Sequence, residues 1–190
     1  LTNMKKWLII LLLFPFSCIA QIYKNLGVED GLSNRRVYSI QKDRKGYMWF
    51  LTHEGIDRYN GKEFKQYKLM DGKEEVNSLL NLNWLYIDTE GVLWEIGKKG
   101  KVYRYDKAHD TFELVYKLPV VENKDMPAPV SYSYIDNSHT IWLCCEKSIY
   151  LYDTKSQDTT EIANAIDETI TDIGQIDETH FFIGTEKGIH

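Results

Sequence analysis

Apolar positions along this chain fall in short bursts, and turns rich in Asp, Asn and Gly separate the bursts. Short apolar or alternating runs bounded by such turns are typical of β-strands. In three bursts a tryptophan follows an aspartate at the same spacing, and the motif returns after about 45 residues. The pairs are Asp43 and Trp49, Asp88 and Trp94, and Asp136 and Trp142, with a weaker fourth copy from Asp177 to Phe182. This period indicates one supersecondary unit used repeatedly, which must bury its apolar faces against its neighbours.

The first copy contains four strand patterns joined by tight turns. Residues 37–41 form the first, and the turn at 43–46 leads into the second at 47–52. In that turn Asp can bond its own backbone and Gly can take positive φ. A third strand at 56–59 is followed by Asn60-Gly61, a strong hairpin signal, and by a fourth strand at 63–68. Four antiparallel strands joined in this way make one propeller blade.

Later copies repeat the unit. Strands are expected at 82–87, 92–96, 101–105 and 111–116, then at 130–135, 140–144, 148–152 and 159–162, and finally at 170–176 and 180–184. Residues 22–26 resemble the outer strands of these blades, and such a strand would close a ring by pairing with the last blade, which is missing here. We therefore predict an all-β fold, a β-propeller of four-stranded antiparallel blades. Its ring is incomplete, with about three and a half blades plus an N-terminal outer strand. The predicted blades are 37–68, 82–116, 130–162 and a truncated 170–190.

The N-terminus has a different composition. Met4, Lys5 and Lys6 provide a positive start, residues 7–16 are apolar, and residues 17–20 are mostly small. This is the layout of a secretory signal peptide, and its apolar run is short for a membrane span. Cys18 suggests a lipoprotein, but residues 15–17 are a poor context for lipid attachment. We predict a signal peptide at 1–20, cleaved after Ala20, and an exported partial propeller at 21–190.

Composition and cysteine placement narrow the range of functions that this segment can have. The chain is 43% hydrophobic with a formal net charge of -5, which is a globular composition without the basic stripe that nucleic-acid binding requires. Cys144 and Cys145 are adjacent, so they should alternate across one strand as small buried hydrophobes rather than form a disulfide. The histidines are scattered singly, and no phosphate loop, zinc signature or nucleophile elbow is present. We predict no metal site, no cofactor and no nucleic-acid binding for this segment.

Candidate binding residues lie on loops rather than in the repeat motif. The tryptophans occupy a fixed position on an inner strand, where blade packing is a stronger interpretation than sugar stacking. The carboxylates show no pairing for acid–base work. In an up-and-down blade, the variable connections at 27–36, 70–81 and 119–129 share one side with the turns between second and third strands, and variable loops on rigid scaffolds carry binding groups. We place any ligand contact there, with Arg35, Arg36, His53, Glu54, Lys98 and Lys99 as candidates.

The first blade also resembles a known family. Two stretches closely resemble the two-component regulator propeller repeat. The first is the string from Gly31 to Asn34 followed by Val37, and the second is the pattern of Asp, Gly, Trp, Thr, Arg and Tyr from Asp43 to Gly61. The stretch 28–34 resembles the opening of the periplasmic sensor region of hybrid two-component systems. The match covers nearly all of the expected mature chain, tightly in the first blade and loosely in the third and fourth.

The resemblance implies a segment of a larger receptor. It implies two large propellers followed by a β-sandwich, a transmembrane helix in the inner membrane, a histidine kinase and, in hybrid members, a receiver and a DNA-binding region. Such sensors commonly detect oligosaccharides from polysaccharide breakdown and control the genes that use them. The chain is then expected to be a non-catalytic periplasmic fragment of a sensor that acts as a homodimer, with the remaining propeller and kinase domains as partners.

Two alternatives from other classes stay open. One is a secreted propeller hydrolase or lyase acting on glycans, with catalytic residues beyond His190. The other is an inactive truncated scaffold. Sequence downstream of His190 would separate the three hypotheses. A membrane span and a histidine-kinase core would favour the sensor, and paired carboxylates in a closed ring would favour the enzyme. An immediate stop codon would favour the inactive scaffold.

Overall fold

The computed structural model describes residues 23–72, 74–75, 82–120, 127–166 and 168–190. The predicted signal peptide at 1–20 lies outside the described residues, and so does part of the connections at 70–81 and 119–129. In the described part of the chain, no helix is long and apolar enough to cross a membrane.

Three complete blades and the first half of a fourth make up the fold, all antiparallel. Within each sheet the strands follow chain order. The first blade is β1 (Val37–Lys42), β2 (Met48–Thr52), β3 (Ile56–Tyr59) and β4 (Phe64–Tyr67); the second is β7 (Leu82–Ile87), β8 (Leu93–Gly97), β9 (Lys101–Asp106) and β10 (Thr111–Lys117); the third is β11 (Tyr132–Ile135), β12 (Thr140–Cys144), β13 (Ser148–Asp153) and β14 (Thr159–Ala163); and the fourth is β15 (Ile170–Gln175) and β16 (Phe181–Thr185).

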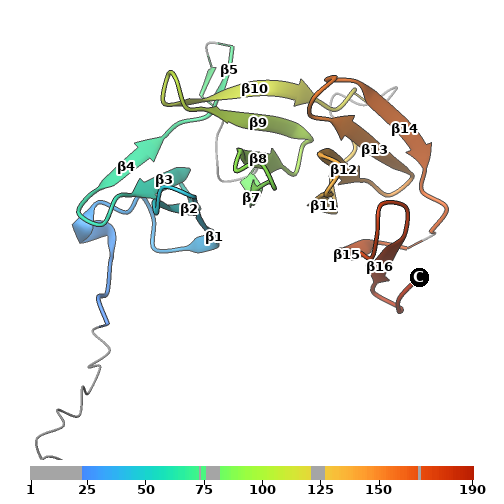
Figure 1. Ribbon diagram of the computed structural model, residues 1–190, viewed down its shortest axis with the longest axis horizontal. Helices are drawn as coiled ribbons and strands as arrows, with labels where there is room; N and C mark the ends of the chain where they lie inside the picture. The colour runs from blue at the N-terminus through green and yellow to red at the C-terminus, as the bar shows by residue number, and fades with distance from the viewer. Residues whose placement is uncertain (1–22, 73, 76–81, 121–126, 167) are drawn as a thin grey trace, which may run out of the picture.

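The blades stand side by side in an open arch. Inner strands β1, β7, β11 and β15 lie toward its concave side, and outer strands β4, β10 and β14 form its rim (Figure 1). The predicted propeller of four-stranded antiparallel blades with an open ring is confirmed. Observed strand bounds agree with the expected ones at half of the ends and differ by one or two residues at the others, as assigned strand ends usually do.

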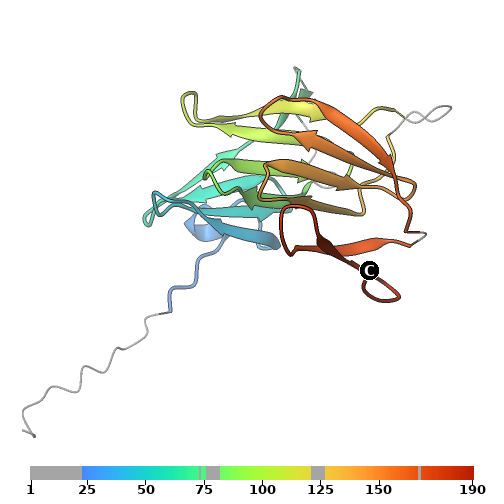
Figure 2. The ribbon, with the colours of Figure 1, turned by 45° about the vertical axis from the view of Figure 1, so that its right-hand side comes forward.

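The predicted N-terminal outer strand is wrong for the residues that are described. Residues 23–27 form no strand, and they run out from the sheets in both ribbon views (Figures 1 and 2). Strand-forming side chains are not sufficient, because a strand exists only where its backbone groups pair with a neighbouring strand. Two short features were not expected from the sequence: the 3-10 helix η1 (Val28–Asp30) and a two-stranded hairpin of β5 (Met70–Asp71) and β6 (Glu74–Glu75).

The tryptophans pack between blades, as predicted from their fixed position. Trp49 on β2 is 1% exposed and lies with Tyr67 against Tyr105 and Phe112 of the second blade, at ring-centroid distances of 4.8 Å and 6.1 Å to the latter two. Trp94 occupies the corresponding position between blades two and three, and Trp142 lies 4.7 Å from Phe181 in the fourth. Each indole therefore joins its own blade to the next one.

Hydrogen bonds explain the fixed spacing from aspartate to tryptophan. In each full blade the aspartate Oδ2 accepts from the indole Nε1 of its tryptophan, at 3.0, 2.9 and 2.9 Å, while Oδ1 accepts two backbone N–H groups of the turn. One carboxylate thus shapes the turn and orients the packing residue. In the fourth copy Asp177 still accepts backbone N–H groups of its turn, but the side chain of Phe182 has no N–H donor and Phe182 is 58% exposed.

The two adjacent cysteines point to opposite faces of the third blade. Cys144 packs with blade four and Cys145 with blade two, both are free thiols, and both are buried. Burial raises the pKa of Cys144 to about 12 and that of Cys145 to about 11. Since the thiolate is the nucleophile, both should resist alkylation.

We therefore expect iodoacetamide in mildly alkaline buffer to leave Cys144 and Cys145 unmodified in the folded chain and to modify both in concentrated guanidinium chloride. Peptide mapping by mass spectrometry reports these two separately from Cys18. Rapid modification of either residue under native conditions would show that its blade interface opens readily.

Candidate functional site

Four of the six residues predicted to contact a ligand lie together on one edge of the first blade. Arg35 and Arg36 directly precede β1, and His53 and Glu54 form the β2–β3 turn. The backbone N–H of His53 donates to the carbonyl of Arg36 at 3.0 Å. Arg35 forms an exposed ion pair with Glu29 at 3.7 Å and lines a hollow of about 450 Å³ beside η1. The structure thus joins this turn and the connection at 27–36 that leads into β1, which we call the entrance loop, into one surface.

The other two predicted residues lie on the next blade. Lys98 and Lys99 form the β8–β9 turn, at the same edge of the second blade as the β2–β3 turn occupies in the first. The carbonyl of Lys98 accepts a hydrogen bond from the backbone of Val130 at 2.8 Å, which ties this turn to the connection entering the third blade. We call this edge, with all six predicted residues, the loop edge.

A buried carboxylate holds the entrance loop in place. Both the N–H and the hydroxyl of Ser33 donate to Oδ2 of Asp57, at 2.8 Å and 2.7 Å, and the same hydroxyl lies 2.7 Å from that of Thr52. Asp57 is fully buried, and this burial raises its pKa even though the bonds from Ser33 oppose the shift. Asp57 therefore anchors the loop that presents Arg35 and Arg36, a role that the sequence did not reveal.

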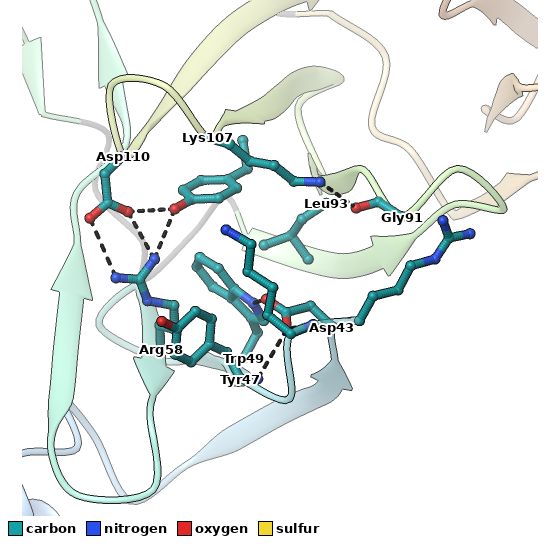
Figure 3. Close-up of a pocket in the computed structure, with 11 residues that line it drawn as sticks. Asp43, Tyr47, Trp49, Arg58, Gly91, Leu93, Lys107 and Asp110 are labelled. Atoms are coloured by element: carbon teal, nitrogen blue, oxygen red, sulfur yellow. Dashed lines mark hydrogen bonds and ion pairs between the residues drawn. The ribbon is translucent and has the colours of Figure 1, made fainter.

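A second candidate site opens on the opposite edge, between blades one and two. Its volume is about 260 Å³, and Figure 3 shows side chains from both blades around it. Trp49, Tyr105 and Leu93 are buried and form its floor, while half-buried Tyr47 stands at its side. We call this cavity the junction pocket.

An ion pair from one blade to the other forms one wall of the junction pocket. The guanidinium of Arg58 donates to Asp110 at 2.9 Å and to the hydroxyl of Tyr105 at 2.8 Å, and it lies 4.8 Å from the ring centre of Tyr47. Asp110 also accepts hydrogen bonds from Lys65, Tyr67 and Tyr105. Burial raises the pKa of Asp110, but these bonds and the charge of Arg58 outweigh it and hold that pKa well below its ordinary value.

Three more cations stand at the rim of the junction pocket. Arg44 and Lys45 belong to the β1–β2 turn and Lys107 to the β9–β10 turn, and all three side chains are exposed. None of these three cations is among the residues predicted from the sequence, which lie on the other edge. The sequence did contain a signal for this site: the β1–β2 turn and the β9–β10 turn both carry basic residues, and these turns lie on the same edge of adjacent blades.

In the part of the chain that the structure describes, one group of metal-ligating residue types occurs, on the outer hairpin of the second blade. Asp106, His109 and Glu113 have ligand atoms within 4.8 Å of one another. His109 is hydrogen-bonded to Asp106, and this bond raises the pKa of His109 and lowers that of Asp106. The His–Asp pair accounts for the grouping without an ion.

Comparison with known proteins supports the family resemblance at the first blade. Residues 31–54 match the two-component regulator propeller family. This segment includes the end of the entrance loop, β1, β2 and most of the β2–β3 turn. No curated protein matches the chain.

Solved structures share the fold. The chain is similar to the extracellular domain of the hybrid two-component system BT4673 from B. thetaiotaomicron, with a TM-score of 0.68, 22% identity and coverage of 87% of this chain and 21% of that one. The extracellular domain of the hybrid two-component system BT3049 from the same organism has a TM-score of 0.66 and 21% identity, and the match covers 88% of this chain and 26% of that one. A streptogramin B lyase structure has a TM-score of 0.54 and 15% identity, and the match covers 80% of this chain and 48% of that one. The chain thus spans about a fifth to a quarter of the two sensor domains, and these likenesses establish the fold.

Proposed function

We propose, on the premise that residues 31–54 match the two-component regulator propeller family, that this chain is a segment of the ligand-sensing region of a two-component sensor. The segment is exported to the periplasm, acts without catalysing a reaction, and reports oligosaccharides from polysaccharide breakdown. Its partners are the remaining propeller and kinase domains of a homodimeric receptor. The observation that carries the proposal is this family match at the first blade, together with the fold shared with extracellular domains of hybrid two-component systems.

The loop edge is the proposed contact surface for the oligosaccharide or for a neighbouring domain. A buried hydrophobic cluster packs blade one against blade two, and Asp57 holds the entrance loop on the first blade through Ser33. A rigid scaffold that holds exposed, chemically varied loops is the usual arrangement for binding. Exposed Arg36 and Lys98 offer N–H donors that suit sugar hydroxyls, and they stand on adjacent blades.

Titration of the full-length receptor against a panel of oligosaccharides tests this proposal. We expect one class to bind, and Arg36→Ala and Lys98→Ala each to weaken its binding about tenfold, which corresponds to about 1.4 kcal/mol. Lys62→Ala, which removes an exposed cation from the β3–β4 turn on the opposite edge, is the matched control and should leave the affinity unchanged.

Two results would count against it. Absence of binding by every oligosaccharide of the panel would overturn carbohydrate sensing. Unchanged affinity in both loop-edge variants would exclude the loop edge as the contact surface. Cleavage of a panel member during incubation, detected by mass spectrometry, would favour the hydrolase or lyase alternative.

A further inference from the structure

The two carboxylates of the junction pocket are already hydrogen-bonded within the protein itself. Asp43 accepts the indole N–H of Trp49 and two backbone N–H groups of its own turn. Asp110 is held by Arg58, Lys65 and two tyrosine hydroxyls. Among the described residues neither carboxylate forms an ion pair with a rim cation, and the pocket lining, with four cationic and two acidic side chains, has a net positive charge.

Two of the three rim cations, Arg44 and Lys107, are held by neutral oxygens instead. The side chain of Arg44 reaches from blade one to blade two, and its guanidinium donates to the carbonyl of Thr89 at 2.5 Å. Lys107 donates to the carbonyl of Gly91 at 3.2 Å (Figure 3). Across the described residues, Arg44, Lys45 and Lys107 form no ion pair with a carboxylate. The acid of the facing turn, Glu90, is engaged with Lys155 at 3.0 Å and His139 at 3.3 Å, on the side of blade three.

A glycine allows this arrangement. Gly91 adopts a φ of 80°, and a Cβ at this position would lie 3.1 Å from Nε of Arg44. Because the turn carries no side chain there, the arginine lies directly against it. The guanidinium therefore spans the gap between the two blades at the mouth of the pocket.

The repeat itself provides an internal comparison. At the junction of blades two and three, the places of Arg44, Lys45 and Lys107 are taken by Thr89, Glu90 and Thr154, and Gln157 replaces Asp110. Asp110 and Gln157 share the left-handed backbone conformation, with φ of 52° and 64°, so the two hairpins correspond in shape. The cations are consequently a property of the first junction and not of the blade motif. They accumulate there in a chain whose net charge is -5.

We propose that the junction pocket binds a single sugar unit bearing a carboxylate or sulfate group, with the anion against Arg44, Lys45 and Lys107 and the ring toward Tyr47 and Leu93. Its volume of about 260 Å³ is below the range typical of drug-sized ligands and suits one ring. The anionic character follows from the unbalanced cations, whereas the choice of a sugar rests on the proposed function. This site lies on the edge opposite to the loop edge and is independent of it.

Calorimetric titration of the full chain at low ionic strength with glucuronate, a sulfated glucose, neutral glucose and inorganic sulfate tests this assignment. We expect the two anionic sugars to bind at least tenfold more tightly than glucose and than inorganic sulfate. The double variant Lys45→Gln/Lys107→Gln should bind both anionic sugars at least tenfold more weakly. The matched control is Lys62→Gln/Lys147→Gln, which removes the same charge from two exposed lysines that line neither the junction pocket nor the predicted loop contact, and it should change affinity less than twofold. Circular dichroism confirms that both variants are folded.

Several outcomes would overturn the assignment. These are absence of binding by both anionic sugars, equal binding of glucose, inorganic sulfate binding as tightly as the sugars, or equal weakening in the control variant, which would indicate nonspecific charge attraction. Failure here is distinguishable from failure of the sensor proposal, because the oligosaccharide response of the full-length receptor and its dependence on Arg36 and Lys98 are measured separately.

Discussion

Trp49→Ala is expected to lower the free energy of unfolding by about 3–5 kcal/mol, the range for truncating a large buried aromatic side chain. Trp49 is 1% exposed and contacts three other aromatic rings between blades one and two. Its removal leaves a cavity at this interface and deprives Asp43 of its indole donor. Urea unfolding followed by circular dichroism measures the loss without relying on tryptophan fluorescence.

Two companion variants separate packing from hydrogen bonding. Trp49→Phe keeps an aromatic ring but removes the N–H, so we expect a loss of about 1–2 kcal/mol. Trp142→Ala should cost less than Trp49→Ala, because Trp142 is only half-buried and faces the two-stranded fourth blade. A loss below about 1 kcal/mol in Trp49→Ala would contradict the assignment of the repeated tryptophan as the main contact between blades.

Asp110→Asn is expected to destabilise the chain by about 2 kcal/mol at neutral pH, since it removes the charge that Arg58, Lys65 and two tyrosines share. The value allows for solvent screening, because the Asp110 side chain is 36% exposed. The folded state lowers the pKa of Asp110, so its contribution is fully present above the ordinary pKa of 3.8 and is lost as the pH falls toward the lower folded value. The variant should therefore lose less stability than the wild type on acidification.

Urea titrations at neutral and acidic pH measure both effects. Asp158→Asn is the matched control, since Asp158 is exposed and lies at the end of the corresponding hairpin in the third blade. It should leave stability within about 0.5 kcal/mol of wild type. If Asp110→Asn lost stability on acidification as steeply as the wild type, the junction network would not be the source of the acid sensitivity.

Local patterns predicted the blades well because their causes are local. The turn between β1 and β2 needs only Asp43 and a glycine, and the indole of Trp49 reaches back to the same aspartate. Strand existence followed from these repeated cues in every blade. The N-terminal segment at 22–26 was the exception, because pairing depends on a strand that need not be near in sequence.

The candidate sites depended on contacts that span blades. Arg58 meets Asp110 across 52 positions, and Arg44 meets Thr89 across 45. Nothing in either segment alone indicates its partner. Ser33 and Asp57 are closer in the chain, yet their bond forms only because the entrance loop folds back onto β3. The candidate residues of the loop edge were predicted from topology, and their role in binding stays a prediction.

By itself, the sequence determined the strand order, the turn chemistry, the interval of the repeat and the tryptophan that faces the next blade. These follow from interactions within a few residues, which the alternation of apolar and polar positions records directly. Only the tertiary structure decided which turns come together at each edge, and hence that three cations gather at the first junction without a carboxylate partner among the described residues. The reason is physical: charge is balanced in space, and the neighbours that balance or fail to balance it are brought together by the stacking of blades.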